Sequence, residues 1–490
     1  MRPSAFATAA AILSVASASA SDEPTRAETV PCPFDVPAGR HADCYFVIRP
    51  LGGGSDSDLE ARLFTVVFRA REPGAPLVYL DGGPGGSSFL MPDQIETWWW
   101  LLDTYPFLAQ RDLVVFAQRG SPPSETSIDC PAFKAAVTRL LALGADHRGT
   151  AEDTRLEAIV ACVAALHDQG IELDAFTTPH RAADVPALLG ALGYESWHLW
   201  GVSYGTHLAL SVLRDHPEGT RSLILESVMT PNVAADLVPD DRSQFRRLLF
   251  DACAEDALCA RRFPDLPAAF ERVVRRLDDS PLAWTSDDGR ADALVLDGDV
   301  LGEIIEITAY YGTLGRYVPA MIGAADGGDF DLLSSIAGIE VGYEREDGMA
   351  SLALDARWCA EVWPFLDPAL ASVADIHELR HDIVPDGAAY CQAIGVDPLG
   401  PQSLVAATSE VPVLLLAGTM DPVTPPAWAH AAARTLANAT VIEFPGRAHA
   451  FAFEDACAMA AMQGFLDDSA TASVTPCLAT LAPPPFEIEP

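Results

Sequence analysis

The sequence is poor in positive charge. Its 490 residues include 69 Asp and Glu but only 31 Lys and Arg, which gives a formal net charge of -38. Nucleic-acid binding needs clustered Lys and Arg that displace phosphate counterions, and anionic membrane surfaces attract basic segments in the same way. The composition therefore argues against nucleic acid and membrane surfaces as partners. It is compatible with substrates that carry a cationic amine, which a negative field attracts.

Long apolar runs are also absent, apart from one near the N-terminus. Residues 1–20, MRPSAFATAAAILSVASASA, combine Arg2, an apolar stretch at about 5–15 and small residues at 18–20. This pattern is typical of a signal peptide cleaved before Ser21, and the stretch is shorter than the ~20 residues that span a bilayer. We expect an exported protein, periplasmic or extracellular, with no membrane anchor in its mature form.

The sequence contains no C-x-x-C pair, which argues against a structural zinc site. It does contain ten cysteines, and oxidising compartments allow cysteines to persist as disulfides. Ten cysteines permit about 945 pairings, and the sequence does not choose rigorously among them. Pairing of nearest neighbours is the simplest arrangement because each bridge then closes a short loop. It would join Cys32–Cys44, Cys130–Cys162, Cys253–Cys259, Cys359–Cys391 and Cys457–Cys477.

Short apolar runs bounded by Gly, Pro and Asp alternate with helix-compatible stretches along much of the chain. The first two runs, 44–48 and 62–68, flank a Gly- and Ser-rich loop and predict antiparallel strands. Further strands are predicted at 76–80, 112–117, 196–202, 222–226, 411–418 and 439–444. Near-continuous apolar strands separated by helices are typical of a mostly parallel, doubly wound α/β sheet.

The alternation stops between residues 231 and 409, where helix formers dominate. We interpret this segment as an inserted, mainly helical cap over the carboxyl edge of the sheet. The predicted organisation is a signal peptide (1–20), a first part of the α/β core (21–230), the cap (231–409) and a second part of the core (410–490). The aromatic run TWWW at 97–100 either lines a substrate cleft or packs in the interior, and packing is the simpler interpretation.

The stretch WGVSYGTHLAL places Ser203 between Gly201 and Gly205. G-x-S-x-G occurs by chance in roughly one chain in six of this length, so an ordinary serine in a glycine-rich loop is the alternative. Here the motif follows an apolar strand and opens a helix, as a nucleophile elbow requires. The two glycines would let the strained turn pack closely. The N–H of Tyr204, at the start of the helix, would face a developing oxyanion.

A second oxyanion donor is expected after an earlier strand. VYLDGGPGGSS follows the strand that ends at Leu80 and offers the N–H of Gly83, with a plain tight turn as the alternative. In an α/β-hydrolase the acid and then the histidine follow the serine along the chain. Asp421 comes just past a strand in LLLAGTMDPVTPP, and His449 follows the last strand in VIEFPGRAHAF. The long gap before Asp421 requires the inserted cap.

These motifs resemble the α/β-hydrolase exopeptidases of the prolyl aminopeptidase and tripeptidyl aminopeptidase group, particularly secreted bacterial members. The resemblance runs from about Asp43 to the C-terminal region and rests on GGPGGSS, QRG, GVSYGTH, VPVLLLAGTMDPVTPP and GRAHAF. Asp81 stands where prolyl aminopeptidases have the histidine of HGGPG, and Ala117 replaces the acid of DQRG. The residues before His449 also differ from the usual GxGH. These departures weaken strict proline specificity. The large cap and the set of cysteines resemble the tripeptidyl type more closely.

The resemblance implies an α/β-hydrolase fold with a helical cap and a serine exopeptidase activity that needs no cofactor or metal. Ser203 would be the nucleophile, His449 the general base and Asp421 the residue that orients it. Peptides with a free N-terminal amine would be the substrates. Glu226 and Glu361 are candidates to bind that amine, as cap carboxylates do in similar aminopeptidases, and solvated surface glutamates are the alternative. A carboxylesterase with the same triad is the alternative function, and an inactive fold used for binding is a third.

Overall fold

A computed structural model describes residues 25–52, 59–71, 74–141, 148–232, 243–285, 293–308, 314–344, 350–366, 387–468 and 475–489. The predicted signal peptide, residues 1–20, lies outside these ranges. Within them, none of the helices combines the length and the apolar character needed to cross a bilayer.

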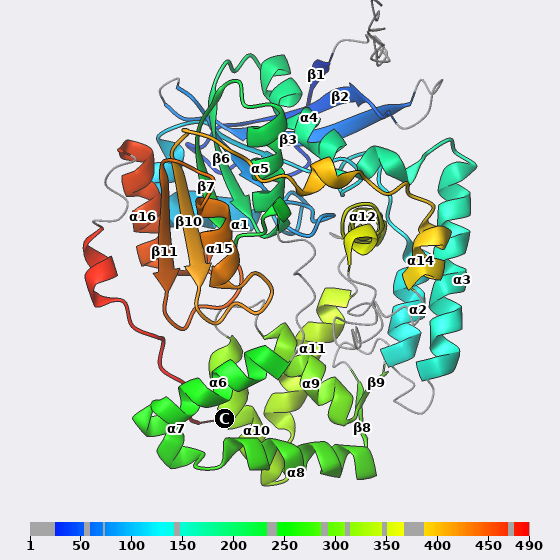
Figure 1. Cartoon of the computed structure of the whole chain (residues 1–490), viewed down its shortest axis with the longest axis vertical. Helices are drawn as coiled ribbons and strands as arrows, with labels where there is room; N and C mark the ends of the chain where they lie inside the picture. Colours follow the sequence, from blue (N-terminus) through cyan, green and yellow to red (C-terminus); the bar gives the residue numbers. More distant parts are fainter. Residues whose placement is uncertain are drawn as a thin grey trace, which may run out of the picture.

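A nine-stranded sheet with the order β1-β2-β3-β5-β4-β6-β7-β10-β11 runs through the molecule (Figure 1). Its first four members in this order pair antiparallel, and the pairs from β5–β4 to β10–β11 are parallel. The strands are β1 (Arg26–Val30), β2 (Ala42–Pro50), β3 (Glu60–Phe68), β4 (Leu77–Leu80), β5 (Leu113–Phe116), β6 (Trp197–Val202), β7 (Thr220–Glu226), β10 (Val413–Gly418) and β11 (Ala439–Phe444). Every predicted strand is present. The polar edge strand β1 was not predicted.

Both faces of the sheet are covered, because successive side chains of a strand point to opposite sides. In β4, Val78 and Leu80 belong to one hydrophobic core, and Leu77 and Tyr79 belong to the other. The first core is shared with α4 (Thr178–Ala191), α5 (Tyr204–Asp215) and α15 (Pro426–Ala433). The second is shared with α1 (Glu96–Thr104) and α16 (Ala456–Asp467). This is the predicted doubly wound arrangement.

The TWWW run packs in the second core. Trp98 and Trp99 are buried, whereas Trp100 is 49% exposed. The Trp98 ring meets Tyr79 edge to face at 4.9 Å, and its indole N–H donates to the carbonyl of Ser88. The run therefore supports the sheet through core packing, as the simpler interpretation predicted.

A separate helical cluster, with its own hydrophobic core, lies beyond the carboxyl edge of the parallel strands (Figure 1). In α8, for example, Leu266, Phe270, Val273 and Leu277 recur every three or four residues and are buried, as one face of an amphipathic helix requires. The cluster contains α6 (Ser243–Glu255), α7 (Ala257–Arg262), α8 (Leu266–Asp279), α9 (Gly298–Ile307), α10 (Val318–Asp326), α11 (Asp331–Glu344) and the hairpin of β8 (Leu282–Thr285) and β9 (Ala293–Leu296).

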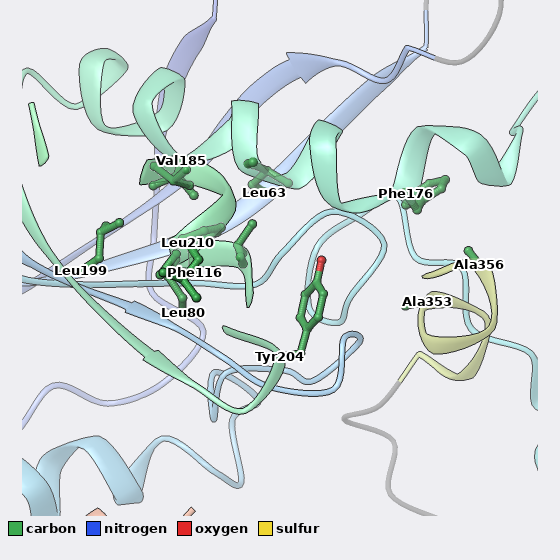
Figure 2. Packing of buried hydrophobic residues seen from close by; sticks show 14 of the residues in the cluster. Leu63, Leu80, Phe116, Phe176, Val185, Leu199, Tyr204, Leu210, Ala353 and Ala356 are labelled. Carbon is green, nitrogen blue, oxygen red and sulfur yellow. The ribbon is translucent and has the colours of Figure 1, made fainter. Parts of the chain in front are cut away.

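The later part of the predicted cap packs elsewhere. Helix α12 (Ser351–Arg357) and the π-helical turn Trp358–Val362 contribute to the first sheet core (Figure 2). Helix α14 (Gly387–Ile394) lies beside α3 (Arg148–His167), which forms a hairpin with α2 (Pro131–Leu141) (Figure 1). In its described residues, the segment between the two parts of the core thus contains the helical cluster α6–α11 and a second group, α12 and α14, which packs on the sheet domain.

All five disulfides join the nearest-neighbour pairs predicted from the sequence. The bridged cysteines are 6 to 32 residues apart, so each bridge is local. Two of them join helices beside the sheet: Cys130, which directly precedes α2, is bonded to Cys162 of α3, and Cys359 of the π-helical turn is bonded to Cys391 of α14. A bridge of this kind stabilises a protein by roughly 2–4 kcal/mol, chiefly by restricting the unfolded chain.

The QRG motif supplies a buried ion pair. Arg119 donates from Nε and Nη2 to the two carboxylate oxygens of Asp184, each at 2.6 Å. Its Nη1 also donates to the carbonyls of Leu51 and Ala175. Burial alone would raise the pKa of Asp184, but Arg119 and Arg49 outweigh it and lower that pKa. The motif therefore ties the end of β5 to α4 and has a structural role.

The approach of α5 to the sheet leaves no room for a side chain at Gly205. A Cβ there would lie 1.8 Å from the carbonyl oxygen of Leu80, and a Cβ on Gly201 would lie 2.4 Å from the carbonyl of Gly205. We expect Gly205→Ala to destabilise the protein by about 3 kcal/mol or more, because backbone must move. Urea unfolding measures this.

Gly190→Ala is the matched control, because a Cβ at that helical position meets nothing within 4 Å. It should change stability by less than about 1 kcal/mol, with alanine favoured by helix propensity. Equal stabilities for the two variants would contradict the close approach of α5 to β4.

Candidate active site

Ser203 occupies a strained turn between β6 and α5. Its backbone angles are φ 55° and ψ −124°, a conformation that residues other than glycine rarely adopt. The serine is half-buried, whereas the residues on either side of it are buried. Its N–H donates to the main-chain carbonyl of Glu226 at 3.0 Å. The local geometry is the strand–turn–helix expected of a nucleophile elbow.

Backbone strain in the described residues is concentrated around this turn. Five non-glycine residues there have positive φ: Ser88, Phe89, Ser203, Ser227 and Ala450. They follow β4, β6, β7 and β11, at the carboxyl edge of the sheet. Each such residue costs of order 1–3 kcal/mol and persists only when its surroundings hold it, which is common at functional sites.

Asp421 and His449 form a buried pair. The Nδ1 of His449 lies 2.9 Å from Oδ2 and 3.1 Å from Oδ1 of Asp421. Thr424 donates to Asp421 from both its N–H and its hydroxyl. Burial alone would raise the pKa of Asp421, but His449 and Thr424 lower it overall. A charged carboxylate on Nδ1 leaves Nε2 as the nitrogen that accepts a proton.

Parallel pairing of β10 and β11 brings these two loops together. Gly418 lies opposite Phe444 at the end of both strands, and the N–H of Met420 donates to the carbonyl of Arg447 at 2.9 Å. A Cβ on Gly418 would lie 2.4 Å from the Arg447 carbonyl, so the loops touch at their bases. The structure thereby unites two residues that are 28 positions apart.

The glycine-rich loop after β4 lies against the Ser203 turn. A Cβ on Gly82 would come within 3.0 Å of the Cβ and 3.5 Å of the Oγ of Ser203. Gly83 follows with φ 99°. Tyr204 is the first residue of α5, where N–H groups have no acceptor within the helix. Both predicted donor segments therefore flank Ser203, and the oxyanion hole itself stays a prediction.

Asp81, one of the departures from the family pattern, closes this loop. Its carboxylate accepts from the Tyr79 hydroxyl at 3.0 Å and from the Ser88 N–H at 2.9 Å. Its main-chain carbonyl accepts from the side-chain amide of Gln118. Burial raises the pKa of Asp81, and hydrogen bonds to its carboxylate from Gly82, Tyr79 and Ser88 partly oppose this rise. Sequence reasoning missed this role, although an acid at the head of a glycine-rich loop is a usable signal.

Glu361 lies in the interior, with only 3% of its surface exposed. One carboxylate oxygen accepts from the N–H of Thr178 and the other from the Thr178 hydroxyl, both at 2.7 Å. That hydroxyl also lies 2.8 Å from the Tyr204 hydroxyl. Burial raises the pKa of Glu361, although Arg357 opposes this. The residue joins the π-helical turn to α4 and α5, and its role as an amine anchor stays a prediction.

Glu226 is 1% exposed and lies close to the Asp421–His449 pair. Its Oε1 accepts from the N–H of Ala452 at 2.6 Å. Burial raises the pKa of Glu226 to about 7, while Ala452, His449 and the Trp200 indole lower it. The structure thus places Glu226 near Asp421 and His449, and it places Glu361 behind Tyr204. Among the described residues, no three His, Cys, Asp or Glu side chains are grouped to hold a metal ion.

Strand order, crossovers and the strand–turn–helix at Ser203 define the class of protein: this is an α/β-hydrolase fold. Residues 380–477 match the family described as TAP-like protein. A probable proline iminopeptidase of Streptomyces coelicolor is 32% identical over 123 residues, which are 22% of this chain and 36% of that protein. A tripeptidyl aminopeptidase of Streptomyces lividans is 30% identical over 172 residues, 34% of this chain and 30% of that protein.

The matched segments span about a third of the length of these curated relatives. Over them, the resemblance to prolyl and tripeptidyl aminopeptidases predicted from the motifs is confirmed. Among solved structures, a proline iminopeptidase-related protein of Thermus thermophilus is 18% identical, with a TM-score of 0.34 over 93% of this chain and 99% of that chain. An esterase of Exiguobacterium antarcticum is 12% identical, with a TM-score of 0.34 over 86% of this chain and 95% of that chain.

The raised pKa of Glu226 predicts how stability depends on pH. Its folded pKa of about 7 exceeds the ordinary value of 4.5, so the folded state binds the proton more tightly. The wild type should therefore lose stability as pH rises from 4.5 through 7, by about 3 kcal/mol relative to Glu226→Gln. Urea unfolding at pH 5 and pH 8 gives the comparison. Glu410→Gln changes an exposed residue before β10 and should follow the wild type at both pH values. A constant stability difference between Glu226→Gln and the wild type from pH 5 to pH 8 would contradict the prediction.

Proposed function

We propose that this chain is an exported serine exopeptidase, which releases single residues or short peptides from free N-termini. The observation that carries the proposal is the strained Ser203 turn at the same sheet edge as the buried Asp421–His449 pair. The resemblance to prolyl and tripeptidyl aminopeptidases supports peptide amides as the substrate class.

In the acylation step, the Ser203 Oγ forms a bond to the scissile carbonyl carbon while Nε2 of His449 takes the hydroxyl proton. Asp421 holds the imidazole through Nδ1 and stabilises the positive charge that it gains. The N–H groups of Gly83 and Tyr204 donate to the oxyanion of the tetrahedral intermediate. When that intermediate collapses, the C–N bond breaks and His449 gives its proton to the leaving amine.

Deacylation repeats these steps with water. His449 removes a proton from the water as its oxygen attacks the acyl carbon, and the same two N–H groups stabilise the second oxyanion. The bond to Ser203 then breaks, and its Oγ regains the proton from His449. The products are a released N-terminal fragment with a free carboxylate and a shortened peptide.

The surroundings of the loops support an exopeptidase. The helical cluster α6–α11 packs against Met420 and Ala448, the neighbours of Asp421 and His449. The Ala350 N–H, which precedes α12, donates to the carbonyl of Gly85 in the glycine-rich loop at 3.0 Å. Both contacts join the inserted segment to loops at the Ser203 edge of the sheet, and an inserted segment at this edge would restrict access for a long chain and favour a substrate end.

Export is part of the proposal. The N-terminal sequence has the pattern of a signal peptide, and five disulfides are of the kind that persists outside a reducing cytosol. A carboxylesterase remains the second candidate, since the same triad and oxyanion donors hydrolyse esters.

Ser203→Ala should lower turnover by roughly 10⁶-fold, because the attacking oxygen is removed. Circular dichroism should show an unchanged fold. Ser335→Ala, an exposed serine on α11, is the control and should retain wild-type turnover. A folded Ser203→Ala variant with most of its activity would exclude Ser203 as the nucleophile.

A free N-terminal amine should be required. N-acetylation removes the positive charge and adds bulk, so hydrolysis of an acetylated peptide amide should be about tenfold to a hundredfold slower or more. The comparison uses matched free and acetylated peptide anilides, with a nitrophenyl ester of a short acyl chain as the third substrate. Equal rates for the two anilides would exclude the exopeptidase, and efficient turnover of the ester alone would establish the esterase.

A further inference from the structure

Two residues at the end of β7 lie between the strands that carry the nucleophile and the acid. In the sheet, Glu226 is opposite Val202 of β6 on one side and Leu416 of β10 on the other. Val202 directly precedes Ser203, and β10 leads into the Asp421 loop. The dipeptide Glu226–Ser227 is therefore in register with both segments.

Hydrogen bonds from this dipeptide reach three chain segments. The main-chain carbonyl of Glu226 accepts the N–H of Ser203 at 3.0 Å, and the Ser227 N–H donates to the carbonyl of Leu416 at 3.0 Å. The side chains hold the histidine loop: Oε1 of Glu226 accepts from the Ala452 N–H at 2.6 Å, and the Ser227 hydroxyl accepts from the Ala450 N–H at 2.9 Å.

The two side-chain hydrogen bonds hold Ala450 and Ala452, which follow His449 in the chain. Ala450 is held at φ 51°, and Ser227 itself is at φ 54°, so neither conformation is favourable without its partners. Ala452 is fully buried, and a buried N–H without an acceptor costs about 1–3 kcal/mol. Removing an acceptor should therefore release the loop from its present position.

We propose that Glu226, together with Ser227, is a positioning residue that sets the placement of His449 relative to Ser203. Its main chain holds the nucleophile turn and its side chain holds the histidine loop, so one residue spans both. The inference rests on the proposed function, because it assigns this bridge a role in proton transfer between Ser203 and His449. It also gives Glu226 a task other than binding the substrate amine.

The surroundings of Glu226 favour positioning over amine binding. The side chain is 1% exposed and one of its oxygens already accepts from the main chain. His449, Asp421, the Trp200 indole and the Tyr79 hydroxyl are among the groups that interact with it electrostatically. These four belong to the carboxyl edge of the sheet or to the core beneath it.

The test compares three variants with one control. Glu226→Leu removes the acceptor for Ala452, and Glu226→Gln keeps an oxygen acceptor but removes the charge. Ser227→Gly removes the hydroxyl, and glycine tolerates the positive φ at this position. This variant tests the positioning role if Glu226→Leu does not fold. Glu443→Gln makes the same chemical change at an exposed site that pairs with His430. The readouts are the labelling rate of Ser203 by a fluorophosphonate, and kcat and KM for nitrophenyl acetate and for a free-amine peptide anilide.

Glu226→Leu should lower the labelling rate and kcat for both substrates by about a hundredfold, with KM within about twofold of the wild type. Ser227→Gly should lower them by about tenfold or more, and Glu226→Gln should lie between Glu226→Leu and the wild type. Glu443→Gln should match the wild type.

Unchanged labelling and kcat in folded Glu226→Leu and Ser227→Gly would overturn the inference, even if their melting temperatures fell. A rise of KM confined to the free-amine anilide would overturn it in favour of an amine anchor. Failure of the proposed function would give a different result. If the wild-type protein is labelled at Ser203 but cleaves no peptide, it is not an exopeptidase. The labelling rates of the variants would still decide the role of Glu226.

Discussion

The geometry of this site depends on how closely α5 approaches β4 and β6. That distance is possible only with glycine at 201 and 205, because a Cβ at either position would collide with a main-chain oxygen. The close approach forces the chain into the positive-φ turn at Ser203 and directs the start of α5 toward the glycine-rich loop. Strand, turn and helix thus present the serine at the edge where the Asp421 and His449 loops also end.

Strained loops at that edge are held by residues from distant parts of the chain. Asp81 closes the glycine-rich loop, and the Glu226–Ser227 dipeptide grips the histidine loop. The C-terminal residues add a further tie: Arg447 donates to the carbonyl of Ala482, Phe486 packs on the helical cluster, and Arg316 of that cluster pairs with Glu487. The C-terminal residues 482–487 therefore link the helical cluster α6–α11 to the histidine loop.

The elements that local sequence patterns encode were predictable. Apolar runs located the strands of the core, short spacing located the disulfides, and position after a strand located Asp421 and His449. Contacts between residues that only tertiary packing brings together were not predictable from the sequence. Glu226 and Glu361 had solvated surface acids as their alternative, yet both are buried and accept hydrogen bonds from main-chain N–H groups of distant segments, Ala452 and Thr178. Likewise, nothing local distinguishes the polar edge strand β1, or separates α12 from the helical cluster α6–α11.

The most direct test is the identity of the covalent intermediate. A peptide with a free N-terminus is mixed with the enzyme, quenched in acid within milliseconds, and the protein is digested and examined by mass spectrometry. The account predicts an adduct on the peptide that contains Ser203, with the mass of the N-terminal one to few residues of the substrate. An adduct on another residue, or one derived from the interior or the C-terminal part of the substrate, would contradict it.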